Sequence, residues 1–354
     1  YPLSHALSSL YMQSQDRELR RTTYLAQCQR YHNFRNTFAN LLNGKVQAHL
    51  FAAKAKNYAS CLDAALFGNS IPVSVYTNLI NETKKRTHLI SQYFSLNKQA
   101  LKLQDFHFYD VYAPISTVEE KRYTYEEGVD LVCSSLHPLG KEYVEILRNG
   151  LLSERWVDRY ENQSKRSGAY SSGCYDSFPY ILLNYSGTIS DVSTITHEAG
   201  HSMHSYFSRK AQPFHDSQYP IFLAEIASTF NEMLLMEALL KEDQPKEEKI
   251  STLAESLDRI FATLFRQVFF AAFELEIHTA AEKGIPLTEE FLSTTYRNLQ
   301  HQFYGEIVTF DELSSIEWAR IPTSTTTFTY INTQQELSQL YALLKKFFHK
   351  KKTP

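Results

Sequence analysis

His197-Glu198-Ala199-Gly200-His201 is the stretch that decides both the fold and the chemistry expected of this chain. In a helix, side chains four positions apart lie on one face, so the two imidazoles can bind one metal ion. Glu225 follows 24 residues after His201 and offers a carboxylate. Two histidines, a carboxylate and an open fourth position are typical of a hydrolytic zinc site, where Glu198 can reach the water held by the metal. The pattern predicts amide hydrolysis.

The alternative is that this five-residue motif falls on a helix surface by chance, as short motifs do. Gly200 argues for a site, because it leaves room for close approach although glycine costs roughly 1 kcal/mol inside a helix. An apolar run at 179–185 precedes the motif and is predicted as a strand beside the metal helix. Its edge can pair with an extended peptide. The candidate substrate-binding residues on this strand are Tyr180, Ile181, Leu182, Asn184 and Tyr185.

Other polar residues near the motif have weaker expected roles. His204 lies one helical turn after His201 and is a candidate for supporting the metal ligands, with a plain surface histidine as the alternative. Glu232 lies two turns after Glu225 and is a candidate for orienting a ligand histidine, with a solvated glutamate as the alternative. Asp191 or Ser193 is expected to cap the metal helix.

The composition favours a mainly α protein with a small antiparallel sheet beside the metal helix. Among 354 residues there are only 11 glycines and 11 prolines, which is few for a turn-rich β fold. Helical periodicity runs through 7–55, with a break expected at Asn43-Gly44, and continues through 52–101. Residues 108–114 are aromatic and end at a proline, as an extended segment would. Further helices are predicted at 124–163, 192–209, 219–241, 247–282 and 287–302.

The net charge and the cysteines indicate which binding partners and which cellular compartment to expect. A formal net charge of −3 gives no reason to expect nucleic acid or an anionic membrane. No apolar run approaches the roughly 20 residues of a membrane span. The four scattered cysteines predict reduced thiols in a cytoplasmic protein, and Cys174 is assigned to structure. The chain begins at Tyr1 rather than Met and is expected to be the back part of something longer.

The sequence resembles the thimet-type zinc oligopeptidases, in particular the bacterial oligopeptidase F branch. The resemblance is strongest at residues 196–206 and 222–229. It extends to DRELR at 16–20, AALFGN at 64–69, YDVYAP at 109–114, GCYD at 173–176, PYIL at 179–182 and WARIP at 318–322. It implies that His197, His201 and Glu225 bind one Zn²⁺ per chain and that Glu198 is the general base. It further implies a zincin-like catalytic domain in a helical, two-lobed body whose deep channel admits oligopeptides.

On this basis three regions are expected: a helical channel-wall region at 1–120, a zinc catalytic domain at 121–322 and an aberrant tail at 323–354. The resemblance stops after Pro322. The family continues there with a segment like HFYYNFYVYKYATG, whose histidine and tyrosines close over the substrate, whereas this chain reads TSTTTFTYINTQQE at 323–336. The family's N-terminal region is also absent from this sequence.

The two strings are related through the genetic code. A nucleotide string can be constructed that encodes the aromatic segment in one frame and matches every residue from Thr323 to Glu336 when read one base later. The bases were chosen to satisfy both frames, but most unrelated segments admit no such string. The hypothesis is therefore a frameshifted tail, with ordinary divergence as the alternative. The nucleotide sequence at the Pro322 codon tests it, because the hypothesis fails if no one-base shift there restores the aromatic string.

Three interpretations follow from the sequence. The first is a zinc oligopeptidase that hydrolyses internal bonds of short peptides, with the activity of this product impaired by the altered tail. The second is a catalytically inactive remnant. The third is a helical binding or scaffold protein that merely retains the motif of the zinc site without using it to bind zinc. Stoichiometric zinc would separate the first two from the third.

Overall fold

The computed structural model describes residues 5–115, 121–166, 168–241 and 245–320. Its contacts divide these residues into two compact units. The first unit combines 5–115 with 257–320, and the second comprises 121–256 without the gaps. The sequence predicted a boundary near 120, and it did not predict that the helices after 256 group with the first unit. The expected tail at 323–354 lies outside the described residues.

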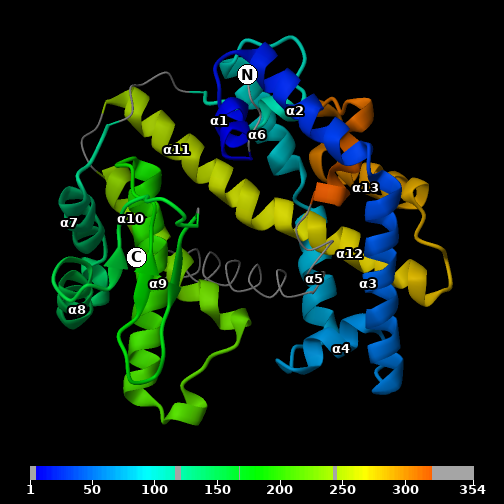
Figure 1. The fold of residues 1–354 in the computed structure, drawn as a ribbon. Helices are drawn as coiled ribbons and strands as arrows, with labels where there is room; N and C mark the ends of the chain where they lie inside the picture. The colour runs from blue at the N-terminus through cyan, green and yellow to red at the C-terminus, as the bar shows by residue number, and fades with distance from the viewer. Residues whose placement is uncertain (1–4, 116–120, 167, 242–244, 321–354) are drawn as a thin grey trace, which may run out of the picture. The chain divides into compact units, whose positions relative to one another are not determined.

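The first unit is helical throughout its described part (Figure 1). Its helices are α1 (His5–Met12), α2 (Arg17–His32), α3 (Arg35–Ala55), α4 (Cys61–Phe67), α5 (Val73–Lys84), α6 (His88–Ala100), α12 (Arg266–Glu282) and α13 (Glu289–Tyr304), with the 3₁₀ turns η1 (Phe108–Asp110), η5 (Gly305–Ile307) and η6 (Glu312–Arg320) and the π-helical segment η4 (Phe261–Phe265). Its core is rich in aromatic rings, including Phe94, Phe108, Phe269, Tyr296 and Tyr304.

Two buried ion clusters hold this unit together. Asp16 caps α2 by accepting from the backbone N–H groups of Glu18 and Leu19. One turn further on, Arg20 donates to the fully buried Asp110 at 2.7 Å. In the second cluster the buried Glu317 accepts from Arg266 and Arg320. A buried charge needs such partners, because it is otherwise costly to remove from water.

The second unit carries the sheet and the motif helix. Its elements are α7 (Tyr125–Ser135), η2 (His137–Leu139), α8 (Lys141–Leu152), β1 (Val157–Asp158), β2 (Tyr170–Ser172), β3 (Tyr180–Leu182), α9 (Ile189–Ala211), η3 (Phe214–Asp216), α10 (Ile221–Lys241) and α11 (Lys246–Ile260), which runs on into η4. Helices α9 and α10 lie side by side (Figure 1). Val192, Ile195, Ala199 and Met203 of α9 pack into the core with Trp156.

The three-stranded sheet has the order β1-β3-β2. Strand β2 pairs antiparallel to β3, but β1 pairs parallel to it, with Val157 opposite Ile181. The sheet is therefore mixed, whereas the sequence predicted an antiparallel one. Strand β3 is the central strand, and Ile181 on its inner side is buried.

Most predicted helices are present with shifted ends, and the differences have local causes. Gly44 lies inside α3 without breaking it, because a single exposed glycine lowers helix stability only modestly. Residues 108–110 form a 3₁₀ turn rather than a strand. The helix predicted at 124–163 ends as α8 at Leu152, and 157–158 join the sheet instead. Among the described residues, no helix is both long and apolar enough to cross a membrane.

Candidate metal centre

Helix α9 begins with a capping box that fixes where the motif lies. Thr188 is the N-cap and accepts from the backbone N–H of Asp191 at 3.0 Å. The Asp191 carboxylate accepts in return from the N–H of Thr188 at 3.0 Å and from Ser186. Burial acts to raise the pKa of Asp191, but these hydrogen bonds outweigh it and lower the pKa. The cap is therefore Thr188, whereas the sequence favoured Asp191 or Ser193 as the capping residue.

Gly200 lets the backbones of α9 and α10 meet. A Cβ atom at position 200 would lie 2.4 Å from the Cα of Ser228 and 2.7 Å from the carbonyl oxygen of Ala227. Any side chain there would collide with backbone, which cannot rotate away. The sequence argument from Gly200 anticipated such an approach. The contact places the first turns of α10, and with them Glu225, against the two histidines.

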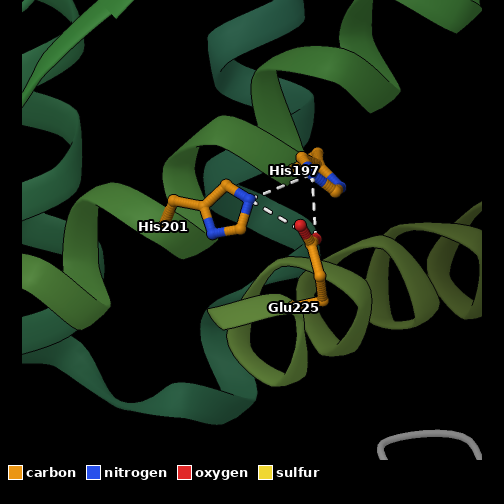
Figure 2. Close-up of side chains that lie close together, drawn as sticks. All are labelled: His197, His201 and Glu225. Atoms are coloured by element: carbon orange, nitrogen blue, oxygen red, sulfur yellow. Dashed lines mark hydrogen bonds and ion pairs between the residues drawn. The ribbon is translucent and has the colours of Figure 1, made fainter. Parts of the chain in front are cut away.

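His197, His201 and Glu225 point toward one another from these two helices (Figure 2). Their candidate ligand atoms all lie within 4.8 Å of one another. The Nε2 atoms of the histidines are 3.1 Å apart, and Oε2 of Glu225 lies 3.3 Å from Nε2 of His197 and 3.4 Å from Nε2 of His201. Two imidazole nitrogens and one carboxylate oxygen converging on one point form a donor set that suits Zn²⁺.

The electrostatics of this cluster follow from burial and mutual contact. Burial acts to raise the pKa of Glu225, but the hydrogen bond and charge of His201, followed by His197, more than offset it and hold the pKa at about 2. Burial acts to lower the pKa of His197, but Glu232, Glu225 and Glu198 outweigh it and raise the pKa. The carboxylates thus create a negative potential at the point where the two imidazoles meet, which favours a cation.

Glu198 is buried beside the cluster, with only 6% of its surface exposed. Its Oε2 is buried and has no hydrogen-bond partner within the described part of the chain. Burial raises the pKa of Glu198, opposed by the nearby His197 and His201. An unpartnered buried carboxylate oxygen is costly unless something else hydrogen-bonds to it. A water bound beside His197 and His201 would give this oxygen a partner, which is the arrangement expected of a metal-hydrolase site.

Glu232 holds the far side of His197. Its Oε1 accepts from Nδ1 of that imidazole at 2.8 Å. Because Nδ1 carries the proton in this contact, Nε2 is left as the free lone pair that faces His201 and Glu225. The sequence singled out Glu232 as a candidate for orienting a ligand histidine, and this geometry is what that role requires.

His204 lies apart from the ligand atoms. Its ring stacks on Tyr219 with centroids 3.7 Å apart, and the Tyr219 hydroxyl pairs with Ser205 at 2.9 Å. Burial, followed by the charge of His201, lowers the pKa of His204. The structure therefore gives His204 an aromatic partner in the loop before α10, and no hydrogen bond from it to His197, His201 or Glu225 is present.

The sheet presents a different edge to α9 from the one the sequence suggested. Ile181 and Leu182 of β3 are paired on both sides, so they have no open edge for a substrate. Asn184 donates to the backbone carbonyls of Arg166 and Gly168, and Tyr185 to those of Tyr123 and Thr124. The outer strand on this side is β2, and Ser171 in it pairs with Ser202 of α9 at 2.8 Å. The unpaired side next to α9 therefore belongs to β2 and not to β3, the strand that the sequence suggested for substrate binding.

Two residues of the site were missed from the sequence. Ser228 donates to Oε2 of Glu225 at 2.7 Å and is fully buried. The spacing of three between Glu225 and Ser228 on one helix was a signal that could have found it. Ser171 lies next to Glu198 and α9 only because the tertiary fold brings them together. No local sequence pattern predicts this contact.

Two histidines on one helix and a glutamate on the next could hold a metal ion, and a buried glutamate lies between the histidines in the motif. This is the arrangement of a metallopeptidase site of the His-Glu-X-X-His kind. The chain belongs to peptidase family M3, whose family model matches residues 10–333. The match includes every residue of the site and runs past Pro322, where the sequence resemblance was expected to stop.

Individual relatives agree with this assignment. Oligopeptidase PepF of Bacillus subtilis (strain 168) is 42% identical over 320 residues, which is 90% of this chain and 48% of that protein. An oligoendopeptidase F homolog of Borreliella burgdorferi is 42% identical over 323 residues, covering 91% of this chain and 55% of the relative. The chain therefore spans about half the length of the curated relatives it matches.

Solved structures show the same fold. A structure from Chlamydophila abortus is 64% identical with a TM-score of 0.90, covering 100% of this chain and 59% of that one. Oligoendopeptidase-F from Enterococcus faecium is 32% identical with a TM-score of 0.77, covering 99% of this chain and 56% of that one. The mainly helical architecture with a small sheet is thus shared with oligoendopeptidase F.

Proposed function

We propose that the chain carries the centre of a zinc-dependent peptidase that hydrolyses internal bonds of short peptides. The observation that carries the proposal is the convergence of His197, His201 and Glu225 within 4.8 Å beside the unpartnered Oε2 of Glu198. The names of the relatives, oligopeptidase and oligoendopeptidase, support peptides rather than folded proteins as substrates. His197, His201 and Glu225 would hold one Zn²⁺ per chain.

A bound Zn²⁺ supplies Lewis-acid polarisation of the scissile carbonyl and lowers the pKa of the attacking water. Glu198 accepts a proton from the attacking water while the water oxygen forms a bond to the carbonyl carbon of the scissile peptide bond. As the C–N bond breaks, Glu198 returns the proton to the leaving amine, so the carboxylate ends in its starting state. Glu232 keeps His197 in the tautomer that leaves Nε2 unprotonated.

The open edge of β2 is the proposed binding strand for the substrate backbone. Tyr170–Ser172 pair with β3 on one side only, and Ser171 is tied to α9 through Ser202. An extended peptide can add to such an edge by main-chain hydrogen bonds. Neither nucleic acid nor a membrane is proposed as a partner. The four free cysteines support a reducing, cytoplasmic setting.

We further propose that this product is impaired, because residues 323–336 replace the aromatic segment that the family resemblance places over the substrate. Removing one donor to the developing oxyanion typically costs on the order of 10²–10³ in turnover. The chain is then expected to bind zinc but to cleave peptides poorly. A version read one base differently after Pro322 is expected to cleave faster.

The test measures zinc content and cleavage of a short internally quenched peptide. It compares the chain, the frame-restored version, Glu198→Gln in each, and Glu142→Gln as an exposed glutamate control from α8. Absence of stoichiometric zinc would overturn the metal site. Zinc binding with cleavage that Glu198→Gln does not reduce would overturn the role of Glu198. Full, Glu198-dependent cleavage by the chain as it stands would overturn the impairment alone.

A further inference from the structure

Ser228 connects the packing of α9 against α10 with the orientation of Glu225. Its backbone is the part of α10 that meets Gly200, and its side chain is fully buried. The hydroxyl donates to Oε2 of Glu225 at 2.7 Å and lies 3.1 Å from the Glu225 backbone carbonyl oxygen. A hydroxyl has a single proton to donate, and an ionised carboxylate is the stronger acceptor.

The oxygen that Ser228 holds is also the one that faces the histidines. Oε2 of Glu225 lies 3.3 Å from Nε2 of His197 and 3.4 Å from Nε2 of His201. A carboxylate oxygen can accept one hydrogen bond and still direct its remaining electron density at a cation. Fixing Oε2 in this way stops the carboxylate from rotating its other oxygen toward the histidines.

We propose that Ser228 is a positioning residue that presents Glu225 to the metal through one oxygen, before the metal arrives. This deepens the proposed function and rests on the metal site described there. Without the hydroxyl, the glutamate side chain has to be ordered when the metal binds, and this ordering weakens binding. Hydrogen-bond partners of metal ligands typically contribute about 10–100-fold to metal affinity.

Thr229 offers a matched control one position away. Its hydroxyl donates to the backbone carbonyl oxygen of the same Glu225 at 2.5 Å, rather than to the carboxylate. Ser228→Ala and Thr229→Val therefore each remove one hydroxyl from the same turn of α10. Only the first removes the contact with the ligand oxygen, and alanine keeps the Cβ and the backbone approach to Gly200.

The experiment measures the zinc dissociation constant by chelator competition, without any peptide, and checks thermal unfolding of the metal-free variants. Ser228→Ala is expected to weaken zinc binding by about 10–100-fold, and Thr229→Val by less than about threefold. In a Glu225→Ala background, Ser228→Ala is expected to change the constant by less than about twofold, because the group through which it acts is gone.

Two results would overturn this role while leaving the metal site intact: Ser228→Ala within about threefold of the unmodified chain, or an equal loss with and without Glu225. The second result would show that Ser228 acts through packing rather than through the carboxylate. If the unmodified chain binds no stoichiometric zinc, the metal site itself fails and this inference fails with it.

Discussion

Nδ1 of His197 lies 2.8 Å from Oε1 of Glu232, so a carboxylate on α10 fixes the tautomer of a proposed metal ligand on α9. Glu232→Gln is expected to weaken zinc binding by about 10–100-fold, because the amide is a poorer acceptor for the imidazole N–H. The fold should persist, since Glu232→Gln conserves shape. Chelator competition measures the effect, and Glu237→Gln on the same helix is the control. Unchanged affinity would remove Glu232 from the site.

Gly200 and Gly44 give opposite expectations for the same substitution. Gly200→Ala places a Cβ 2.4 Å from the Cα of Ser228, so α9 and α10 must separate. The expected loss of unfolding free energy is about 1–3 kcal/mol or more, with weaker zinc binding. Gly44→Ala meets nothing within 4 Å in the interior of α3 and is expected to stabilise by about 0.5–1 kcal/mol. Thermal unfolding of both variants checks the contrast, and a tolerated Gly200→Ala would contradict the close approach.

Glu317 is expected to make the first unit sensitive to acid. Burial acts to raise the pKa of Glu317, but Arg266 and then Arg320 outweigh it and lower the pKa to about 2 from 4.5. A lowered folded-state pKa contributes stability that is complete above about 4.5 and is lost as the pH falls toward about 2. Glu317→Gln should cost about 3–5 kcal/mol at pH 7 by leaving Arg266 unpaired.

Unfolding followed between pH 7 and pH 2 measures this. The difference between the unmodified chain and Glu317→Gln should shrink as the pH falls below about 4.5. Asp105→Asn, which changes an exposed acid of the same unit, serves as the control. A difference that stays constant with pH would show that Glu317 is not ionised in the folded protein.

Glu274 should respond in the opposite direction. It is buried in α12, its Oε1 has no hydrogen-bond partner among the described residues, and burial raises its pKa to about 8. Between about 4.5 and 8 the folded state holds a proton that the unfolded chain releases, so stability falls as the pH rises. Relative to the unmodified chain, Glu274→Met should gain stability with rising pH, on the order of 3 kcal/mol from pH 4.5 to pH 7. Urea unfolding at both values measures the gain, and a pH-independent difference would show that Glu274 is ionised in the fold.

The cluster of His197, His201 and Glu225 could be predicted because its geometry is local to two helices. His197 and His201 share a face by helical spacing alone, and Glu225 follows on the next helix. The start of α9 was misplaced because Thr188 and Asp191 form a capping box, in which each residue hydrogen-bonds to the backbone of the other. From sequence alone, either residue is a reasonable N-cap. Glu225 and Ser228 are three residues apart on one helix, so their contact was visible in principle.

The sheet could not be derived in the same way. Strand β1 is only Val157–Asp158, too short to carry an alternating pattern, and it sits in a stretch that otherwise reads as the end of a helix. Its parallel pairing with Ile181 and Leu182 joins segments more than twenty residues apart. That pairing makes β3 central and leaves β1 and β2 as the edge strands, with β2 tied to α9 through Ser171 and Ser202. Which strand is the edge thus depends on a long-range contact that periodicity does not encode.

The backbone contact between Gly200 and Ser228 limits how this site can evolve. Most crowded positions in a core can be relieved by shrinking a neighbouring side chain, so that two substitutions are acceptable where one is not. At position 200 a second substitution cannot relieve the crowding, because a new side chain would collide with main-chain atoms of Ala227 and Ser228. As long as α9 and α10 approach each other this closely, only glycine fits at position 200. A wider or differently shaped metal centre would require a shift in the register of α10, which would move Glu225, Ser228 and Glu232 together.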